Sequence, residues 1–220
     1  MGRRAGVLLA SLVWLGAAAG AGPHDATSRR SFADVEHWTL VFDDPARAAW
    51  QKPAELVAGL GLRSGQAVAD VGAGTGYFLA HLTAAVGETG TVYAVETEPN
   101  LVVHLRDRAE REGLRNVVPV LASAEHPRLP PGGVDVVLLV DTYHHLDDRP
   151  AYFRRVRRLL APGGRVVVVD WQTRELPVGP GMDHKLAPAQ VGDEMALAGY
   201  RLASAPDLLP YQYVLIFQPR

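Results

Sequence analysis

The sequence of 220 residues contains no cysteine. A disulfide framework, a thiolate zinc site and a cysteine nucleophile are therefore excluded. An excess of charge of either sign is missing too, because 22 lysines and arginines stand against 24 aspartates and glutamates. This balance gives no electrostatic reason to expect binding to nucleic acid or to an anionic membrane. The basic cluster at residues 154–158 is expected to form the solvated face of a helix.

A long hydrophobic run is also lacking. The N-terminal apolar stretch, from about Val7 to Ala19, is too short for an ordinary membrane span. Two arginines precede it and small residues follow it, which is typical of a secretory signal peptide cleaved after Ala19 or Ala21. We expect residues 1–21 to direct export, with the periplasm as destination, or to remain as an uncleaved anchor in the cytoplasmic membrane. The mature chain is expected to have no integral membrane span.

What is present favours a folded chain of ordinary size. Hydrophobic residues make up 48% of the sequence and charged residues 21%, as in globular proteins. A chain of 220 residues can form one domain with a hydrophobic core. We expect an N-terminal extension at residues 22–49, which caps the rest, and one domain at residues 50–220. No sequence feature specifies an oligomeric state.

Apolar segments typical of strands alternate with segments of helical periodicity. Strands are expected at 66–71, 90–96, 116–122, 134–141 and 161–171, with helices at 74–86, 98–114, 149–160 and 187–200. Two final strands, 201–209 and 211–219, have no helix between them, so they should form a hairpin with one antiparallel strand. The sequence therefore predicts an α/β fold, a Rossmann-like doubly wound sheet of seven mostly parallel strands. Pro119 should place its strand at an edge.

A glycine loop, "DVGAGTGYF" at 70–78, stands where the first strand ends and a helix begins. Glycines at 72, 74 and 76 allow a tight turn and a close approach of a ligand to the backbone. Glu96 ends the second strand, where a carboxylate can accept both hydroxyls of a ribose. The spacing is G-x-G-x-G and not the G-x-G-x-x-G of dinucleotide-binding proteins. Asp70 precedes the loop and could meet a ligand ammonium group.

At these motifs the sequence resembles the class I S-adenosylmethionine-dependent methyltransferases, and within them the small-molecule branch that includes quinone-biosynthesis and type 11 enzymes. The resemblance covers about residues 50–219. It rests on the glycine loop, Glu96, "ASAE" at 122–125, "VDTYHHL" at 140–146 and "LLAPGGRVVVVD" at 159–170. It implies S-adenosylmethionine as cofactor and a strand order of 3-2-1-4-5-7-6 with an antiparallel seventh strand.

The resemblance also implies roles for individual residues. The methionine portion of the cofactor would be held by one acid and three glycines, Asp70, Gly72, Gly74 and Gly76. Glu96 would hold the ribose, and Asp141 would lie beside the methionine end. The segment after the third strand would hold the adenine, and there Ser123 stands where the family usually has an aspartate. Ser123, followed by Ala124, can still accept a bond from the adenine amino group, and Glu125 is the alternative acceptor.

Two adjacent histidines follow the fourth expected strand, in "DTYHH" at 141–145. Neighbouring side chains diverge on a strand or loop, whereas zinc ligands need spaced positions such as H-E-x-x-H, so we expect no metal site. The active crevice of a parallel sheet lies at the carboxyl ends of its strands, and imidazole titrates near neutrality. This favours a general base, His145 first and His144 second, with Tyr143 orienting the acceptor. A loop histidine bonded to backbone is the alternative.

Two further residues are expected to contact the substrate. His184 lies in the loop after the fifth strand, and Trp50 precedes the first helix of the domain, where surface packing is the alternative. The predicted function is methyl transfer from S-adenosylmethionine to oxygen or carbon of a small organic acceptor without strong charge. A non-catalytic cofactor- or metabolite-binding protein on the same fold is one alternative. A nicotinamide-dependent oxidoreductase is another, and the glycine spacing and the closing hairpin count against it.

Overall fold

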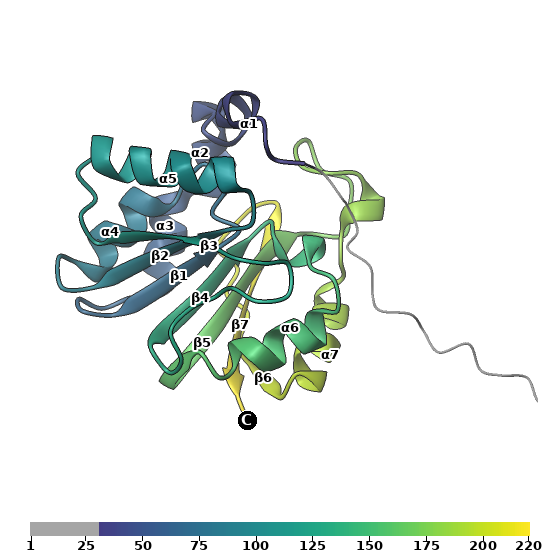
Figure 1. Cartoon of the computed structure of the whole chain (residues 1–220). Helices are drawn as coiled ribbons and strands as arrows, with labels where there is room; N and C mark the ends of the chain where they lie inside the picture. The colour runs from purple at the N-terminus through teal and green to yellow at the C-terminus, as the bar shows by residue number, and fades with distance from the viewer. Residues whose placement is uncertain (1–30) are drawn as a thin grey trace, which may run out of the picture.

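A seven-stranded sheet in the order β3-β2-β1-β4-β5-β7-β6 forms the centre of the computed structural model, which describes residues 31–220 (Figure 1). The first five strands are parallel, and β7 is antiparallel to both of its neighbours. The predicted fold class, strand order and antiparallel C-terminal strand are confirmed. The strands are β1 Ala67–Val71, β2 Thr91–Glu96, β3 Val117–Leu121, β4 Val134–Val140, β5 Leu160–Trp171, β6 Tyr200–Ser204 and β7 Gln212–Pro219.

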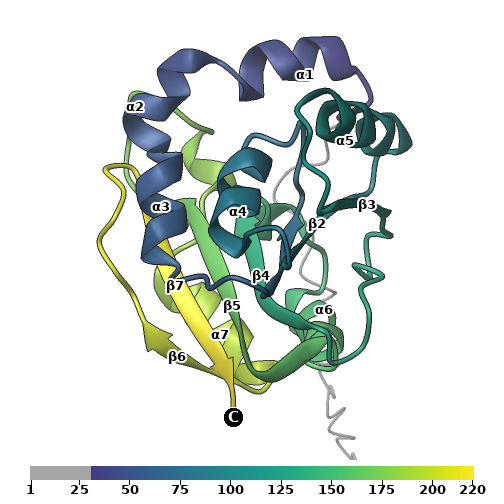
Figure 2. The same cartoon turned by 90° about the vertical axis from the view of Figure 1, so that its left-hand side faces the viewer.

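Helices cover both faces of the sheet, as Figures 1 and 2 show. They are α1 Val35–Phe42, η1 Pro45–Arg47, α2 Ala48–Gln51, α3 Pro53–Gly59, α4 Leu79–Val86, α5 Pro99–Arg111, η2 Tyr143–His145, α6 Arg149–Val156, η3 Met182–His184 and α7 Pro188–Leu197. Helices α3, α4 and α5 pack on one face through Leu56, Leu82 and Leu105, and α6 and α7 pack on the other through Phe153 and Met195. Burial on both faces explains the nearly unbroken apolar runs of β4 and β5.

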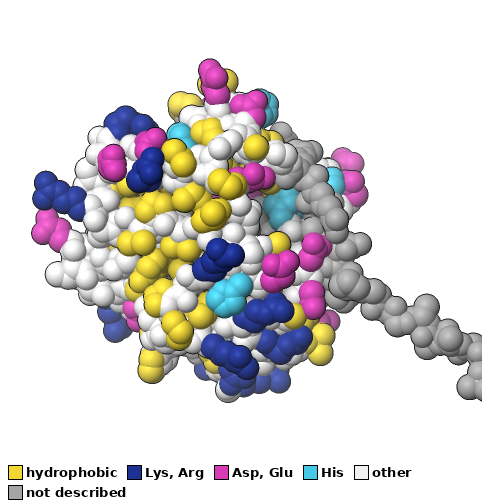
Figure 3. Space-filling view, in the orientation of Figure 1, with side chains coloured by type: hydrophobic (Ala, Val, Ile, Leu, Met, Phe, Trp, Pro, Cys, Tyr) yellow, Lys and Arg dark blue, Asp and Glu magenta, His cyan; other side chains and the backbone are white. Residues whose placement is uncertain are grey.

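The edges of the sheet and its surface follow the sequence closely. Pro119 lies in β3 at the edge, as predicted, because proline cannot donate a ladder hydrogen bond. The arginines of the basic cluster at 154–158 are exposed, and Figure 3 shows positive side chains gathered over α6. In the described part of the chain, no helix has both the length and the apolar character needed to cross a membrane. The export signal predicted at residues 1–21 lies outside the described residues.

The N-terminal segment, α1 to α2, spans the top of the sheet from α5 toward β7 (Figure 2). The predicted boundary between residues 49 and 50 falls inside α2. Helix α1 buries none of its residues fully. Asp43, which follows it, accepts hydrogen bonds from Thr75 Oγ1 at 2.9 Å and from Arg108 Nη1 at 2.7 Å. A polar link therefore ties the segment to the glycine loop and to α5.

Candidate active site

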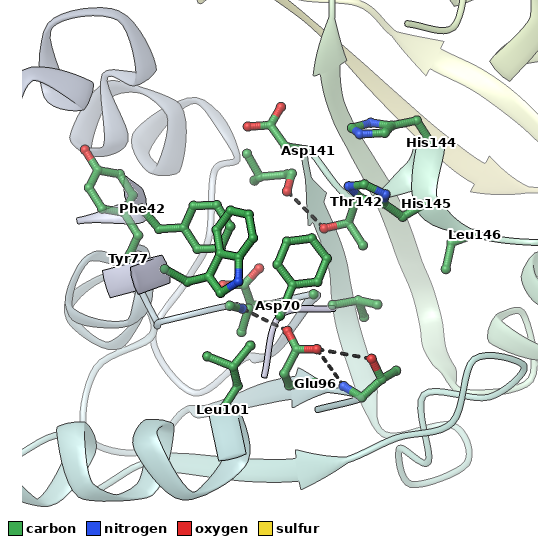
Figure 4. A pocket seen from close by; sticks show the side chains of 18 of the residues that line it. Phe42, Asp70, Tyr77, Glu96, Leu101, Asp141, Thr142, His144, His145 and Leu146 are labelled. Carbon is green, nitrogen blue, oxygen red and sulfur yellow. Dashed lines mark hydrogen bonds between the residues drawn. The ribbon is translucent and has the colours of Figure 1, made fainter. Parts of the chain in front are cut away.

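A cavity of about 690 Å³ lies between the carboxyl ends of β1, β2, β4 and β5 and the N-terminal segment (Figure 4). A volume of roughly 300–1,000 Å³ is typical of small-molecule sites. Most of the residues predicted for cofactor and substrate line it: Trp50, Asp70, Gly72, Gly74, Glu96, Ser123, Ala124, Asp141, His144, His145 and His184. Three predicted residues do not line the cavity: Gly76, Tyr143 and Glu125. Their positions are described below.

The glycine loop turns sharply between β1 and α4. Gly72, Gly74 and Gly76 have φ angles of 76°, 57° and 90°, which residues with a Cβ rarely adopt. A Cβ on Gly72 would clash with the side chain of Thr142, so the loop can approach the segment after β4 only without a side chain. A Cβ on Gly76 would lie 3.0 Å from Leu105. Gly76 therefore allows close packing against α5 and lies outside the cavity lining, and its contact with the cofactor stays a prediction.

Glu96 ends β2 and reaches across to the glycine loop. Its side chain is almost fully buried. Its Oε2 accepts a hydrogen bond from the Gly74 N–H at 3.0 Å, and its Oε1 accepts one from the Thr97 N–H at 2.6 Å. Two backbone donors thus fix the carboxylate within the cavity wall. This position suits the predicted contact with ribose hydroxyls.

Two carboxylates, the buried Asp70 and the partly exposed Asp141, lie at the ends of β1 and β4. Burial raises the pKa of Asp70 to about 7, while the charge of Arg47 lowers it and that of Glu96 adds to the rise. Burial likewise raises the pKa of Asp141 to about 7, against the opposing charge of Arg47. One guanidinium therefore does not offset the burial of both acids. A ligand cation placed between them would favour their ionised forms.

Arg47, the last residue of η1, is a member of this group that the sequence did not point to. Its Nη2 lies 3.8 Å from Asp141 Oδ2. Its Nη1 donates to the Phe42 carbonyl at 3.1 Å, and its Nε and Nη2 donate to Gln51 Oε1 at 3.2 and 3.0 Å. Gln51 donates in turn to Gln212, which donates to Asp141 Oδ1. A hydrogen-bonded chain thus connects the N-terminal segment to the end of β4.

The segment after β3 supplies Ser123 and Ala124 to the cavity wall. The backbone turns back on itself here, because Ser123 and His126 exchange N–H···O bonds at 3.1 and 3.2 Å. The turn places Glu125 on the outer surface, where its carbonyl accepts a bond from Arg155. The alternative role of Glu125 as an adenine acceptor is therefore not supported, and Ser123 is the polar side chain at this position.

His144 lies in η2, directly after β4, and pairs with Asp170 near the end of β5. Its Nδ1 is 2.9 Å from Oδ1 and 3.0 Å from Oδ2 of Asp170, which is fully buried. Burial lowers the pKa of His144, but the hydrogen bond and the charge of Asp170 outweigh it and raise the pKa overall. A carboxylate at Nδ1 orients the ring and directs proton uptake to Nε2. In the sequence, only the position of Asp170 near the end of a strand points to a role for it.

His145 lies against His144 with its ring centroid 4.1 Å away, and its ring meets Phe32 edge-on at 5.8 Å. Figure 4 shows both imidazoles on the side of the cavity opposite Phe42 and Tyr77. The sequence ranked His145 first as a base, whereas the buried carboxylate partner belongs to His144. Across residues 31–220, histidine, aspartate and glutamate side chains form no group of three that could hold a metal ion.

Tyr143 points away from the cavity into the core. Its hydroxyl donates to Glu194 Oε2 at 2.8 Å, and Arg149 Nε donates to the same oxygen at 2.7 Å. Burial raises the pKa of Tyr143, and the charge of Glu194 adds to the rise, so the phenol stays protonated. Side chains diverge along a short 3-10 turn, so Tyr143 anchors η2 to α7 while the histidines face the cavity. The predicted role in orienting the acceptor is not supported.

Aromatic rings form much of the remaining wall. Trp50 of α2 lies 5.2 Å from Trp171 at the end of β5, measured between ring centroids. On the opposite side, three rings of the N-terminal segment cluster with centroids 4.8 to 6.0 Å apart: Phe32, Trp38 and Phe42. His184 of η3 lines the cavity as well. Such walls favour burial of a flat, apolar molecule.

Comparison with known proteins identifies the central part of the chain. Residues 69–168 match the family described as a methyltransferase domain. The ubiquinone/menaquinone biosynthesis C-methyltransferase UbiE of Haemophilus ducreyi is 32% identical over 112 residues, which cover 50% of this chain and 43% of that protein. Methyltransferase GfsG of Streptomyces halstedii is 32% identical over 148 residues, which cover 64% and 52%. The chain spans about half the length of these curated relatives.

Similarity to a solved structure extends over most of the chain. A SAM dependent methyltransferase from Aquifex aeolicus shares the fold with a TM-score of 0.80 and 25% identity, over 86% of this chain and 98% of that one. The matched family region contains the end of β1, the glycine loop and the strand ends that carry Glu96 and Asp141. The matched region and the fold around it are therefore those of class I S-adenosylmethionine-dependent methyltransferases of the small-molecule branch.

Proposed function

We propose that this protein transfers a methyl group from S-adenosylmethionine to a hydroxyl-bearing small molecule, at its oxygen or at an activated carbon. One observation carries the proposal: the same cavity contains two acids suited to a ligand cation and a histidine held by a buried carboxylate. The first feature suits a cofactor with an amino-acid end, and the second suits proton removal from an acceptor.

The residues of the cavity fit the cofactor group by group. The ammonium of its methionine portion would meet Asp70 and Asp141, and its ribose hydroxyls would meet Glu96. Gly72 and Gly74 keep the backbone of the loop open to close approach. When bound, the cofactor supplies an electrophilic methyl group on a sulfonium.

One histidine of the pair, His144, acts as the general base for the acceptor. His144 removes the proton of an acidic hydroxyl, and Asp170 holds the ring and stabilises the resulting imidazolium. Loss of that proton makes the oxygen nucleophilic and, in a phenol, the adjacent ring carbon as well. Methylation at oxygen and methylation at carbon therefore need the same base. Which atom is methylated depends on the structure of the acceptor. His145 and His184 shape the pocket beside it.

The walls of the cavity indicate a planar acceptor without charge. Phe32, Trp38, Trp50 and Trp171 present ring surfaces to the cavity. Arg47 is the sole lysine or arginine among the described residues that line it, and it lies at the end near Asp141. An anionic acceptor would find no cation beside the histidines, so we expect phenols or hydroquinones to be better substrates than carboxylic acids.

Calorimetry with S-adenosylmethionine and with NAD tests the cofactor, and mass spectrometry of S-adenosylhomocysteine formed with a panel of phenols and aliphatic alcohols tests the reaction. We expect tight binding of S-adenosylmethionine and turnover with phenols. Binding of NAD alone would overturn the proposal. Cofactor binding without turnover of any acceptor would instead support a non-catalytic binding protein, the function that Ser123 in place of the usual aspartate favours.

We also propose that the protein is exported. The support is the sequence pattern of residues 1–21, a basic start followed by an apolar run and small residues. Cell fractionation with N-terminal sequencing tests it, and we expect a periplasmic chain that begins at Gly20 or Gly22. An intact N-terminus in the membrane fraction would identify an anchor, and an intact cytoplasmic chain would refute export.

A further inference from the structure

A buried pair of charges lies behind the histidines, outside the cavity wall. Arg149 begins α6 and Glu194 lies in α7, and they are 2% and 5% exposed. Arg149 Nε donates to Glu194 Oε2 at 2.7 Å, and Arg149 Nη2 donates to Oε1 at 3.0 Å. Desolvation of two charges offsets much of their attraction, and an apolar pair of similar volume is often no less stable. The stability of the fold therefore gives no reason for a charged pair at this place.

The pair fixes the turn that carries the two histidines. Leu146 caps η2 and lines the cavity, and its carbonyl accepts a hydrogen bond from Arg149 Nη1 at 3.1 Å. At the other end of η2, the ring of Tyr143 stacks on that of Phe153, with centroids 5.3 Å apart. The guanidinium thus binds Glu194 with one edge and the backbone after η2 with a further nitrogen. Glu194 orients the guanidinium, and the guanidinium fixes the end of the turn that packing alone does not fix.

The charges around His144 oppose one another. Burial lowers the pKa of His144, whereas the hydrogen bond and charge of Asp170 and the charge of Asp141 raise it. The positive charge of Arg149 lowers this pKa, and the ring of His145 packs alongside. A base must be neutral before it can take a proton. Arg149 therefore counteracts two carboxylates that favour the protonated, inactive form of the ring.

Three further titratable side chains surround this group. Burial raises the pKa of Tyr213 in β7, so its hydroxyl, which donates to the Leu186 carbonyl at 3.2 Å, carries no charge. Arg47 faces Asp141 at 3.8 Å from the N-terminal segment. The carboxylate of Glu194 partly cancels the charge of Arg149. The charge of Arg149 on its own therefore has a direct effect on the histidine, and Glu194 moderates that effect.

We infer that Arg149, oriented by Glu194, is a positioning residue for methyl transfer: it fixes the turn that carries His144 and opposes protonation of that imidazole before the reaction. The inference rests on the proposed role of His144 as the general base. Arg149 acts through the backbone of η2 and through its charge, because neither it nor Glu194 lines the cavity. A charged pair within the core thereby gains a function that an apolar pair could not supply.

Two variants separate the bond to the turn from the charge. Arg149→Lys keeps a cation beside Glu194 but has no planar fork to bind Glu194 and the Leu146 carbonyl at once. Its turnover should fall about 10- to 100-fold through misplacement of the base, while His144 titrates as in wild type. The double variant Arg149→Met with Glu194→Met removes both charges and leaves neither unpaired, so it should fold. Its turnover should fall likewise, and His144 should titrate at higher pH because the opposing positive charge is gone.

Three measurements follow these changes. NMR of protein with ¹⁵N-labelled histidine, with the signal assigned through His144→Gln, gives the titration of His144 without any substrate. Rates with the phenol that wild type turns over fastest give kcat, and circular dichroism and calorimetry with S-adenosylmethionine show whether each variant keeps its fold and its cofactor affinity. Arg154→Met removes an exposed arginine of the same helix and is the matched control, which should change none of these.

The outcomes are distinct. Unchanged turnover in both variants, or an unmoved titration of His144 in the double variant, would overturn the inference. Equal losses of turnover and of cofactor affinity would show a purely structural role and would overturn it as well. Wild type that turns over no acceptor would instead overturn the proposed reaction, and the NMR titration would still decide whether Arg149 acts on His144.

Discussion

Replacing Asp70 with asparagine should make the ligand-free protein more stable while it abolishes tight cofactor binding. Asp70 is 2% exposed, and burial raises the pKa of its carboxyl from 3.8 to about 7. In the unfolded chain the carboxyl ionises near pH 4, but in the folded chain it holds its proton until pH 7. Unfolding is therefore favoured progressively between these values, and above pH 7 the penalty is complete.

The magnitude follows from the two pKa values. Each pH unit of difference corresponds to about 1.4 kcal/mol, so a pKa of about 7 in place of 3.8 corresponds to roughly 4 kcal/mol above pH 7. Asparagine has a similar shape and no charge, so the variant avoids this penalty. The gain should shrink to under about 1 kcal/mol at pH 4, where the folded carboxyl is protonated.

Urea unfolding of both proteins at pH 8 and pH 4, without cofactor, measures the effect. Asp207→Asn, a change at an exposed acid, is the matched control and should leave stability unchanged at both pH values. Equal stability of wild type and Asp70→Asn at pH 8, or the same difference at both pH values, would refute the reasoning. Calorimetry of the same variant should show at least a ~10-fold loss of affinity for S-adenosylmethionine, because a charged partner of its ammonium is gone.

Three other substitutions test separate parts of the site. Asp170→Asn removes the anion that raises the pKa of His144, so the inflection in a plot of rate against pH should move to lower pH. Turnover should fall about 10-fold or more while cofactor affinity is unchanged. An inflection that does not move would contradict the pairing of His144 with Asp170. Trp50→Ala should weaken ligand binding several-fold in calorimetry, and unchanged affinity would assign Trp50 to surface packing. Tyr143→Phe leaves Glu194 without one donor and should cost about 1–2 kcal/mol in urea unfolding while turnover of the folded enzyme is kept. Lost turnover at unchanged stability would restore the acceptor-orienting role.

The fold and the acids of the site could be predicted because local patterns determine them. Alternating apolar strands and amphipathic helices specify a parallel sheet, and Pro119 specifies an edge. Asp70, Glu96 and Asp141 each follow or end an apolar strand, and the carboxyl ends of parallel strands meet at one edge. Residues at those positions therefore come together whatever the details of packing.

The residues that were missed or misplaced depend on tertiary contacts. Asp170 gains its role from His144, which is 26 residues away in the sequence. Arg47 lies in a short 3-10 helix that carries no pattern of its own and is placed by its contacts with Gln51 and aromatic rings. The direction of Tyr143 depends on the turn of η2 and on a partner in α7. None of these three contacts can be predicted from the spacing of residues along the sequence.

The link from Asp43 to Thr75 and Arg108 has a consequence for how ligands are exchanged. Asp43 and Arg108 do not line the cavity, and their side chains are 23% and 16% exposed, so solvent ions can screen the pair. Since α1 buries no residue fully, breaking this link loosens the part of the segment around α1, while Arg47 and Gln51 still hold the rest. We therefore expect the exchange of ligands at this end of the cavity to become faster as ionic strength rises, without a change in the stability of the fold.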